Sequence, residues 1–208
     1  MRSELEQFRD KQFGVFTAEQ VRLEYTRAEL RARLDRQEWV RVFQGVYREA
    51  TTPSTPALRV EAARLSMGPP FLAASYDTAA ELHGFSVLDD QLTHVLGGQV
   101  SRSRRLIVHR DRIDPAELEL IQGSVATNAA RTAVDVARTA NRMDALATLD
   151  LALRLGLSRA ELAVEVAKHA GRRGRRQAVE LIELADRRAE SHGVAHQTAM
   201  HRRRPAAP

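Results

Sequence analysis

The sequence contains no cysteine, few aromatic residues and only two lysines, Lys11 and Lys168. The absence of cysteine excludes disulfide bonds, thiol nucleophiles and zinc sites built on cysteine ligands. No apolar segment approaches the ~20 residues that cross a bilayer, because the uncharged run 65–76 is broken by Gly68-Pro69-Pro70. The first residues also lack the apolar stretch of a signal peptide. We therefore expect a cytoplasmic protein without a membrane partner.

The remaining composition is that of a globular protein, and its charge is unevenly distributed. The 208 residues, 43% hydrophobic and 28% charged, suggest one or two compact domains. Residues 1–50 carry a net charge of +1, whereas residues 168–208 carry +6. Basic charge attracts nucleic acid, but GC-rich codon usage also produces many arginines. The number of arginines therefore identifies no partner, and their positions must decide.

The first fifty residues predict three helices followed by a hairpin. A short helix from about Leu5 ends at Gly14. Two segments match a capping box and open helices through about residues 23 and 36; they are Thr17-Ala18-Glu19-Gln20 and Thr26-Arg27-Ala28-Glu29. Apolar and polar residues roughly alternate in 38–43 and 46–48 around a Gly-containing turn, which is typical of a β-hairpin. This order of elements is that of a winged helix-turn-helix.

Such a unit would place the second capped helix in the major groove of DNA, with its amino-terminal residues facing the base edges. Arginine suits this position because its guanidinium binds guanine or phosphate through two parallel hydrogen bonds. The candidate DNA-binding residues on the helices and the hairpin are Thr17, Thr26, Arg27, Arg31, Arg33, Arg41, Gln44 and Arg48. The alternative interpretation is a small helical domain with solvated arginines, since the net charge here is only +1.

A linker of small polar residues with two prolines, 51–56, separates the predicted domain 1–50 from the rest of the chain. Beyond it, residues 57–190 predict a mixed, mostly helical domain with a small sheet, so the fold class is α+β. Strands are expected at 92–96, 106–109, 118–122 and 124–127. Helices are expected at 57–66, 75–83, 129–138, 144–155, 158–168 and 177–189, the fifth opened by a third capping box at Ser158. Residues 191–208 predict a flexible basic tail.

Histidines and acidic residues give little support for a catalytic or metal site. His83 fits the carboxyl end of a helix, and His94 and His109 lie in predicted strands without an evident partner. The acidic pair Asp89-Asp90 is typical of an exposed turn. The spacing of His192, His196 and His201 resembles that of metal ligands, but these residues lie in the predicted tail. We expect no enzymatic activity, catalytic residue, metal ion or cofactor.

One basic segment has two interpretations. Gly171-Arg172-Arg173-Gly174-Arg175-Arg176 lacks the Lys-Ser/Thr pair of a nucleotide-binding loop. It is either a solvated loop between two helices or a contact for a phosphate or an acidic partner.

Several segments together resemble the AbiEi-type antitoxins of type IV toxin–antitoxin pairs. The resemblance covers about residues 14–191, and its motifs lie in 14–20, 39–48, 75–84, 125–138 and 145–153. It implies a repressor that binds double-stranded DNA at its own promoter through a winged helix. It also implies that the second domain helps a homodimer to bind the operator or restrains a cognate nucleotidyltransferase-type toxin. Many relatives continue into a Vsr-like endonuclease domain, and the resemblance therefore suggests a truncated relative without it.

The sequence thus predicts a non-catalytic DNA-binding regulator with an antitoxin-like second domain. The alternative is a protein-interaction module that does not bind DNA, or the remnant of a nuclease-fused protein.

Overall fold

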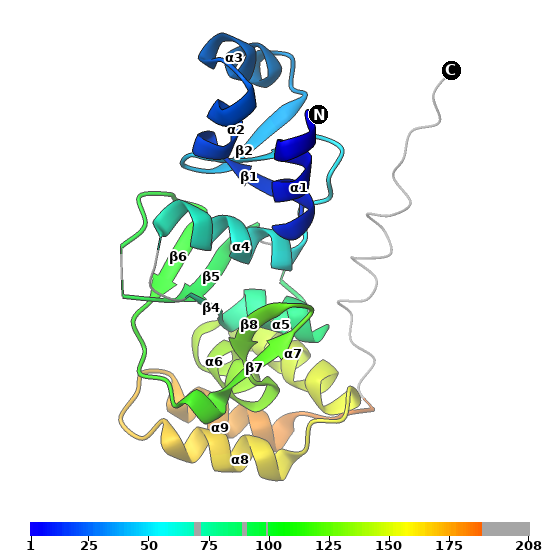
Figure 1. The fold of residues 1–208 in the computed structure, drawn as a ribbon. Helices are drawn as coiled ribbons and strands as arrows, with labels where there is room; N and C mark the ends of the chain where they lie inside the picture. Colours follow the sequence, from blue (N-terminus) through cyan, green and yellow to red (C-terminus); the bar gives the residue numbers. More distant parts are fainter. Residues whose placement is uncertain (69–71, 89–90, 99, 189–208) are drawn as a thin grey trace, which may run out of the picture.

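The computed structural model describes residues 1–68, 72–88, 91–98 and 100–188. Figure 1 shows three regions stacked along one direction. The first fifty residues lie at one end, α4 (Pro56–Met67) and a second sheet lie in the middle, and the last helices lie at the other end. The α+β class that the sequence predicts is confirmed.

The first fifty residues form helices, a short strand and a hairpin. The elements are α1 (Ser3–Lys11), β1 (Val15–Thr17), α2 (Ala18–Glu24), α3 (Arg27–Asp35), β2 (Trp39–Phe43) and β3 (Val46–Glu49). Both predicted capping boxes are present, because Thr17 and Thr26 each accept a backbone hydrogen bond while Gln20 and Glu29 bond back to the cap. The strands form an antiparallel sheet in the order β1-β3-β2. Strand β1 was not predicted, because three residues are too few for a recognisable alternation.

The rest of the chain forms a second sheet and a group of helices. After α4 come β4 (Ala73–Ala74), α5 (Tyr76–His83), β5 (Thr93–Leu96), β6 (Leu106–His109), the 3-10 helix η1 (Pro115–Glu117), β7 (Leu118–Ile121), β8 (Ser124–Thr127), α6 (Ala129–Thr139), α7 (Arg142–Arg154), α8 (Arg159–Lys168) and α9 (Arg175–Leu184). The strand order is β6-β5-β4-β8-β7, with parallel pairing in β5–β6 and β4–β8. The third predicted capping box, at Ser158, opens α8.

The last helix is shorter than predicted. The sequence predicts a helix over 177–189, whereas α9 ends at Leu184 and Ala185 is extended. Two tertiary hydrogen bonds hold the chain after it in this conformation. The Asp186 amide donates to Asp150 Oδ1 at 2.7 Å, and the Arg159 guanidinium donates to the carbonyl of Ala185. These bonds come from α7 and α8, so local sequence could not reveal them.

The predicted linker is tied to both of its neighbours. Thr55 caps α4 by accepting from the amide of Leu58, and Arg48 of β3 donates to the carbonyl of Thr52 at 2.6 Å. Beneath it, side chains of the first sheet, α4 and the second sheet share one hydrophobic cluster. Its buried members are Val15, Phe43, Val46, Leu58, Ala62, Ala63, Leu72, Val95 and Leu106. The first fifty residues are therefore packed on the second sheet through α4.

The helical region encloses an ionic network around Arg131 of α6. Arg131 is 2% exposed and bonds Asp135 at 2.6 Å and Glu117 at 2.8 Å. Arg138 also bonds Asp135, at 2.8 Å, and Nδ1 of His169, the residue that follows α8, lies 3.8 Å from Asp135 Oδ1. Buried charges persist only when they are paired in this way. In the part of the chain that the structure describes, no helix is long and apolar enough to cross a membrane.

Candidate nucleic-acid interface

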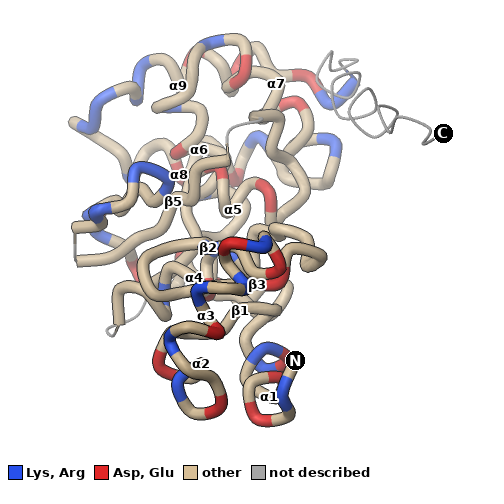
Figure 2. Tube along the Cα trace, turned by 90° about the horizontal axis from the view of Figure 1, so that it is seen from above, with Lys and Arg blue, Asp and Glu red and all other residues tan. Residues whose placement is uncertain are grey.

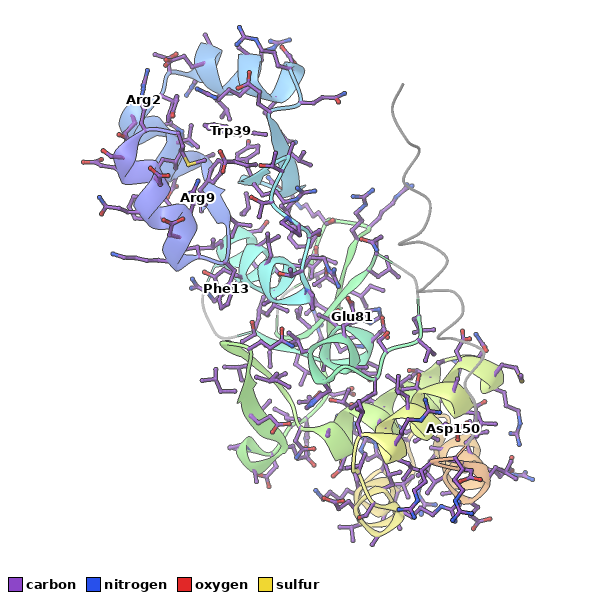
Figure 3. The ribbon with its side chains drawn as sticks, turned by 90° about the vertical axis from the view of Figure 1, so that its right-hand side faces the viewer. Arg2, Arg9, Phe13, Trp39, Glu81 and Asp150 are labelled. Atoms are coloured by element: carbon purple, nitrogen blue, oxygen red, sulfur yellow. The ribbon has the colours of Figure 1, made fainter. Side chains whose placement is uncertain are left out.

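The first fifty residues have an aromatic core of their own. Trp39 of β2 packs edge-on against Phe16 and Tyr25, with ring centroids 4.8 and 5.4 Å apart. Leu5 of α1, Val21 of α2 and Tyr47 of β3 complete this cluster, and all six residues are buried. Figure 3 shows Trp39 between the helices and the strands of this end of the molecule. This core fixes α3 and the hairpin relative to one another.

Helix α3 rests on this core with a minimal contact. None of its residues is fully buried. Leu30 and Leu34 are its partly buried side chains that pack against the aromatic cluster. Figure 1 shows α3 at the free end of the molecule, away from the second sheet and the later helices. A long side of the helix is therefore open to solvent, as docking into a groove requires.

Arg27 and Arg31 lie on the exposed side of α3. The Arg31 side chain is 85% exposed, and its nearest carboxylate contact is a long one, 3.9 Å from Nε to Asp35 Oδ2. Within the described residues, the Arg27 side chain has no ion pair or hydrogen bond. Exposed ion pairs as long as that of Arg31 contribute little stability. Both guanidinium groups are therefore available to an external anion.

Arg33, by contrast, is occupied within the protein. Its guanidinium lies over the rings of Tyr25 and Trp39, at 5.3 and 5.1 Å, and pairs with Glu38 at 2.7 Å. The sequence groups Arg33 with Arg27 and Arg31 as a candidate DNA-binding residue. The structure separates it from them, because the aromatic faces attract its guanidinium and Glu38 fixes it there.

The hairpin residues differ in the same way. Arg41 and Gln44 are exposed, and the Arg41 guanidinium lies 5.8 Å from the ring of Tyr47. Arg48 donates through Nη1 to the carbonyls of Glu49, Ala50 and Thr52. Arg48 therefore holds the linker, and its place on β3 lies behind the hairpin tip.

Thr17 and Thr26 both act as helix caps. Thr17 is half-buried and belongs to the edge of the first sheet, where it pairs with Val46. Thr26 is exposed at the start of α3. The backbone and side chain of Thr26, followed by Arg2, hold the pKa of Glu29 below its usual value. Glu29 is therefore ionised at the start of α3, where the positive end of the helix dipole stabilises it.

The charges on this end of the molecule are mixed. Figure 2 shows Lys or Arg close to Asp or Glu along α1, α2 and α3. Arg2 pairs with Glu29 at 2.7 Å, and Arg9 pairs with Glu49 at 3.0 Å. The hydrogen bond to Asp10 raises the pKa of Arg9 above its usual value against the opposing effect of burial, and Glu49 raises it further. The structure thus brings Thr26, Arg27 and Arg31 together on α3, with Arg41 and Gln44 on the adjacent hairpin.

Two histidines that sequence analysis left without partners contact each other. His94 Nδ1 of β5 lies 2.9 Å from His109 Nε2 of β6, and the ring of Tyr76 stacks on His109 at 3.8 Å. His109 pairs with Leu96, two residues after His94, so the two histidines lie diagonally on the same face of adjacent parallel strands, an arrangement that sequence alone does not predict. His83 has the structural role expected of it, with Nε2 2.8 Å from the Thr127 carbonyl.

Among the residues that the structure describes, no group of three or more His, Asp or Glu side chains could hold a metal ion. The histidines His192, His196 and His201 and the pair Asp89-Asp90 lie outside these ranges.

Two relatives of known sequence match most of this chain. Two proteins of Mycobacterium tuberculosis, named uncharacterized proteins MT2308 and Rv2248, are each 40% identical over 169 residues. The alignment covers 80% of this chain and 60% of each relative, so the chain spans about three fifths of the relatives' length.

The fold is also similar to a solved structure, that of the RV2827C protein from Mycobacterium tuberculosis. The TM-score is 0.57 at 14% identity, and the match covers 98% of this chain and 81% of the other. The AbiEi antitoxin C-terminal domain family matches residues 72–184, more than half of the chain. The chain therefore belongs to the family of AbiEi antitoxin C-terminal domains.

Proposed function

We propose that this protein is a non-catalytic, DNA-binding regulator with an antitoxin-like role, and that residues 1–50 are its winged helix-turn-helix. In this proposal it represses its own operon from the cytoplasm. The family supports the antitoxin-like role. The observation that carries the DNA-binding part is α3 itself, an exposed helix at the free end of the molecule with two unoccupied arginines beside a hairpin.

The mechanism assigns different tasks to the arginines. Arg27 and Arg31 reach the major groove from α3, where a guanidinium reads guanine or binds phosphate. Arg41 and Gln44 on the hairpin contact the adjacent backbone or minor groove. Arg33 and Arg48 hold α3 and the linker in position, because their guanidinium groups are already bonded within the protein. Thr17 and Thr26 contribute mainly by fixing the starts of α2 and α3.

The second region provides the partner-binding part of the proposal. Its family membership favours a role in restraining a cognate toxin or in pairing two copies on an operator. An alternative function, a protein-interaction module that uses α3 as a docking surface, is favoured by the mixed charges in Figure 2. A solvated helix with both signs of charge suits a protein partner as well as DNA.

A gel-shift assay with DNA from directly upstream of the protein's own gene, against scrambled DNA of equal length, tests the proposal. Wild-type protein should prefer its own DNA, and Arg31→Ala should weaken that binding by ~1–3 kcal/mol if Arg31 reads a base. If Arg31 contacts only phosphate, both DNAs should lose affinity equally and the salt dependence should fall by about one ion.

A matched control is available on the opposite end of the molecule. Arg176 of α9 is 94% exposed and pairs with an acid four residues away, just as Arg31 does. Arg176→Ala should leave DNA binding unchanged. Equal binding of own and scrambled DNA by wild-type protein, or equal losses in the two variants, would favour the protein-interaction module.

A further inference from the structure

A second basic site lies far from α3, in the helical region. A cavity of about 860 Å³ opens between the loop after β6, the end of α6 and the loop that joins α8 to α9. Its lining includes Arg110, Arg112, Arg138, Arg172 and Arg173. The basic segment 171–176, for which the sequence left two interpretations, forms one wall. This volume is within the range of cavities that bind small molecules.

The balance of charge in the cavity strongly favours an anion. Asp111 is the one carboxylate among the described lining residues, against five guanidinium groups. Asp111 is itself occupied, since the Tyr76 hydroxyl donates to it at 2.6 Å and Arg172 lies 3.5 Å away. Burial raises the pKa of Asp111, but the Tyr76 hydroxyl and nearby arginines lower it overall.

Three of these arginines have no bonding partner among the described residues. Within the described ranges, the side chains of Arg110, Arg112 and Arg173 have neither an ion pair nor a hydrogen bond. All three are exposed at the opening of the cavity. Unpaired arginines occur elsewhere on the surface too, so the argument rests on three of them lying around one cavity that holds a single carboxylate. They form a set of donors that nothing in the described protein uses.

The wall of the cavity contains a buried arginine as well. Arg138 is 9% exposed, and it donates to the Arg173 carbonyl and to Asp135, both at 2.8 Å. Its Nε has no hydrogen-bond partner within the described residues. The bond to the Arg173 carbonyl fixes the 171–174 loop over the cavity. A buried, oriented guanidinium thus holds the wall that carries the free arginines.

The amino terminus of α9 opens at the same place. Gly174 precedes it with a positive φ of 79°, and no side chain caps the helix. The first turn of α9 contains no acidic residue. The Arg175 amide donates to the carbonyl of Arg172 at 3.3 Å, and the amides after it, together with the helix dipole, add to the positive potential that the arginines create.

We propose that this cavity binds the polyphosphate group of a small molecule. Phosphate matches the donors, because guanidinium groups bind its oxygens through paired hydrogen bonds. A single phosphate would engage few of the arginines around a cavity of this size, whereas two or three linked phosphates reach several. Figure 1 places α3 and the loop between α8 and α9 at opposite ends of the molecule, so this site is separate from the proposed DNA-binding helix.

Calorimetric titration of the full chain with inorganic tripolyphosphate, orthophosphate and ATP at constant ionic strength tests this site. Tripolyphosphate should bind with one site per chain and more tightly than orthophosphate. ATP binding as well would identify a nucleotide as an occupant, and tripolyphosphate alone would identify the free polyanion. If neither tripolyphosphate nor ATP bound saturably, the proposal would be overturned. It would also be overturned if a titration with duplex DNA showed that DNA alone binds at this site.

Two double variants with the same change of net charge locate the binding. Arg112→Gln with Arg173→Gln should weaken tripolyphosphate binding at least tenfold, and both side chains are exposed, so the fold should be retained, which circular dichroism checks. Arg27→Gln with Arg31→Gln, at the other end, should leave it within about twofold. Equal weakening in both variants would mean that tripolyphosphate responds only to net charge, and the site would be rejected. The DNA assay should respond in the opposite order, so this proposal and the proposed function fail separately.

Discussion

His94 and His109, both half-buried, share a hydrogen bond beside Tyr76, which stacks on His109 and lines the proposed polyphosphate cavity. Burial and then the neighbouring His94 lower the pKa of His109 to about 4, against the opposing attraction of Asp111 and Asp135. Arg138 lowers the pKa further. Since one ring nitrogen must donate and the other accept, the bond requires at least one neutral imidazole, and the lowered pKa favours His109 as a neutral ring. The native state therefore favours the neutral form of this histidine.

This histidine should make folding stability depend on pH. In the unfolded chain, His109 titrates near its ordinary value of about 6.5. Because the unfolded state then binds protons more readily, stability that is present above pH ~6.5 is lost as the pH falls towards 4. His109→Gln cannot titrate, so its loss of stability between pH 7 and pH 5 should be smaller than that of the wild type. Urea unfolding of the wild type and the variant at pH 7 and pH 5 measures the two losses of stability.

His169 limits the size of this difference. Burial lowers its pKa in spite of Asp135 and Glu165, so it contributes a loss of the same sign. The His109 variant should therefore reduce the pH dependence without abolishing it. A variant with the full wild-type pH dependence would contradict the assigned charge state of His109.

The candidate DNA-binding residues could be predicted by type but not by orientation. Arg27 and Arg31 follow directly from the capping box at Thr26, which fixes where the helix begins. The separate fate of Arg33 depends on Trp39 and Glu38, which reach it only after β2 folds back on α3. Local patterns therefore locate the helix, and tertiary contacts decide which of its arginines remain free.

At the scale of elements, the capped helices and the four-residue strands β5 to β8 could be predicted, whereas the two- and three-residue strands β4 and β1 could not. The boxes at Thr17, Thr26 and Ser158 are all present, because both partners lie within four residues of each other. Strand β4 consists of two residues, Ala73 and Ala74, and its pairing comes from β5 and β8 on either side. Such a strand exists through its neighbours, so nothing in its own sequence predicts it.

The loop between α8 and α9 depends on one glycine. A Cβ atom on Gly174 would lie 2.0 Å from the carbonyl oxygen of Arg138 and 2.9 Å from its carbonyl carbon. Gly171 has a similar positive φ of 76°, but a Cβ atom there would meet nothing within 4 Å. The two glycines thus separate the cost of the backbone conformation from the cost of a steric clash.

Gly174→Ala should be much more destabilising than Gly171→Ala. A left-handed conformation costs an alanine roughly 1–2 kcal/mol, and this alone applies at position 171. At position 174 the backbone of α6 must also move, so we expect a total on the order of 3–4 kcal/mol. Urea unfolding of both variants measures the difference. Equal losses would show that the loop moves away from Arg138 at little cost.

For the whole molecule, the question is whether the two predicted domains unfold separately. The prolines of the linker 51–56 indicate a boundary, and in the structure side-chain contacts cross it at two junctions. Phe43 of β2 is buried in the cluster shared with α4 and the second sheet. At the other junction, the ring of Phe13 lies within 3 Å of the position of a Cβ atom on Gly123. Both sets of contacts tie residues 1–50 to the rest of the protein.

We therefore expect a single unfolding transition. Trp39 is the only tryptophan of the sequence and lies in the first core, so its fluorescence reports residues 1–50. Far-UV circular dichroism reports mainly α4 to α9, where most of the helix lies. The two signals should give the same urea midpoint in the wild type, because a shared hydrophobic cluster couples the regions.

Removing the shared side chain should weaken this coupling. Phe43→Ala takes a buried ring out of the cluster and should cost about 3–5 kcal/mol. The fluorescence midpoint should then fall further than the dichroism midpoint, since residues 1–50 lose their main attachment while the helical core around Leu149 is untouched. Leu149→Ala, in that helical core, is the matched control and should lower both midpoints together. Two separate transitions in the wild type would mean instead that the regions fold independently and that α3 is carried by an autonomous domain.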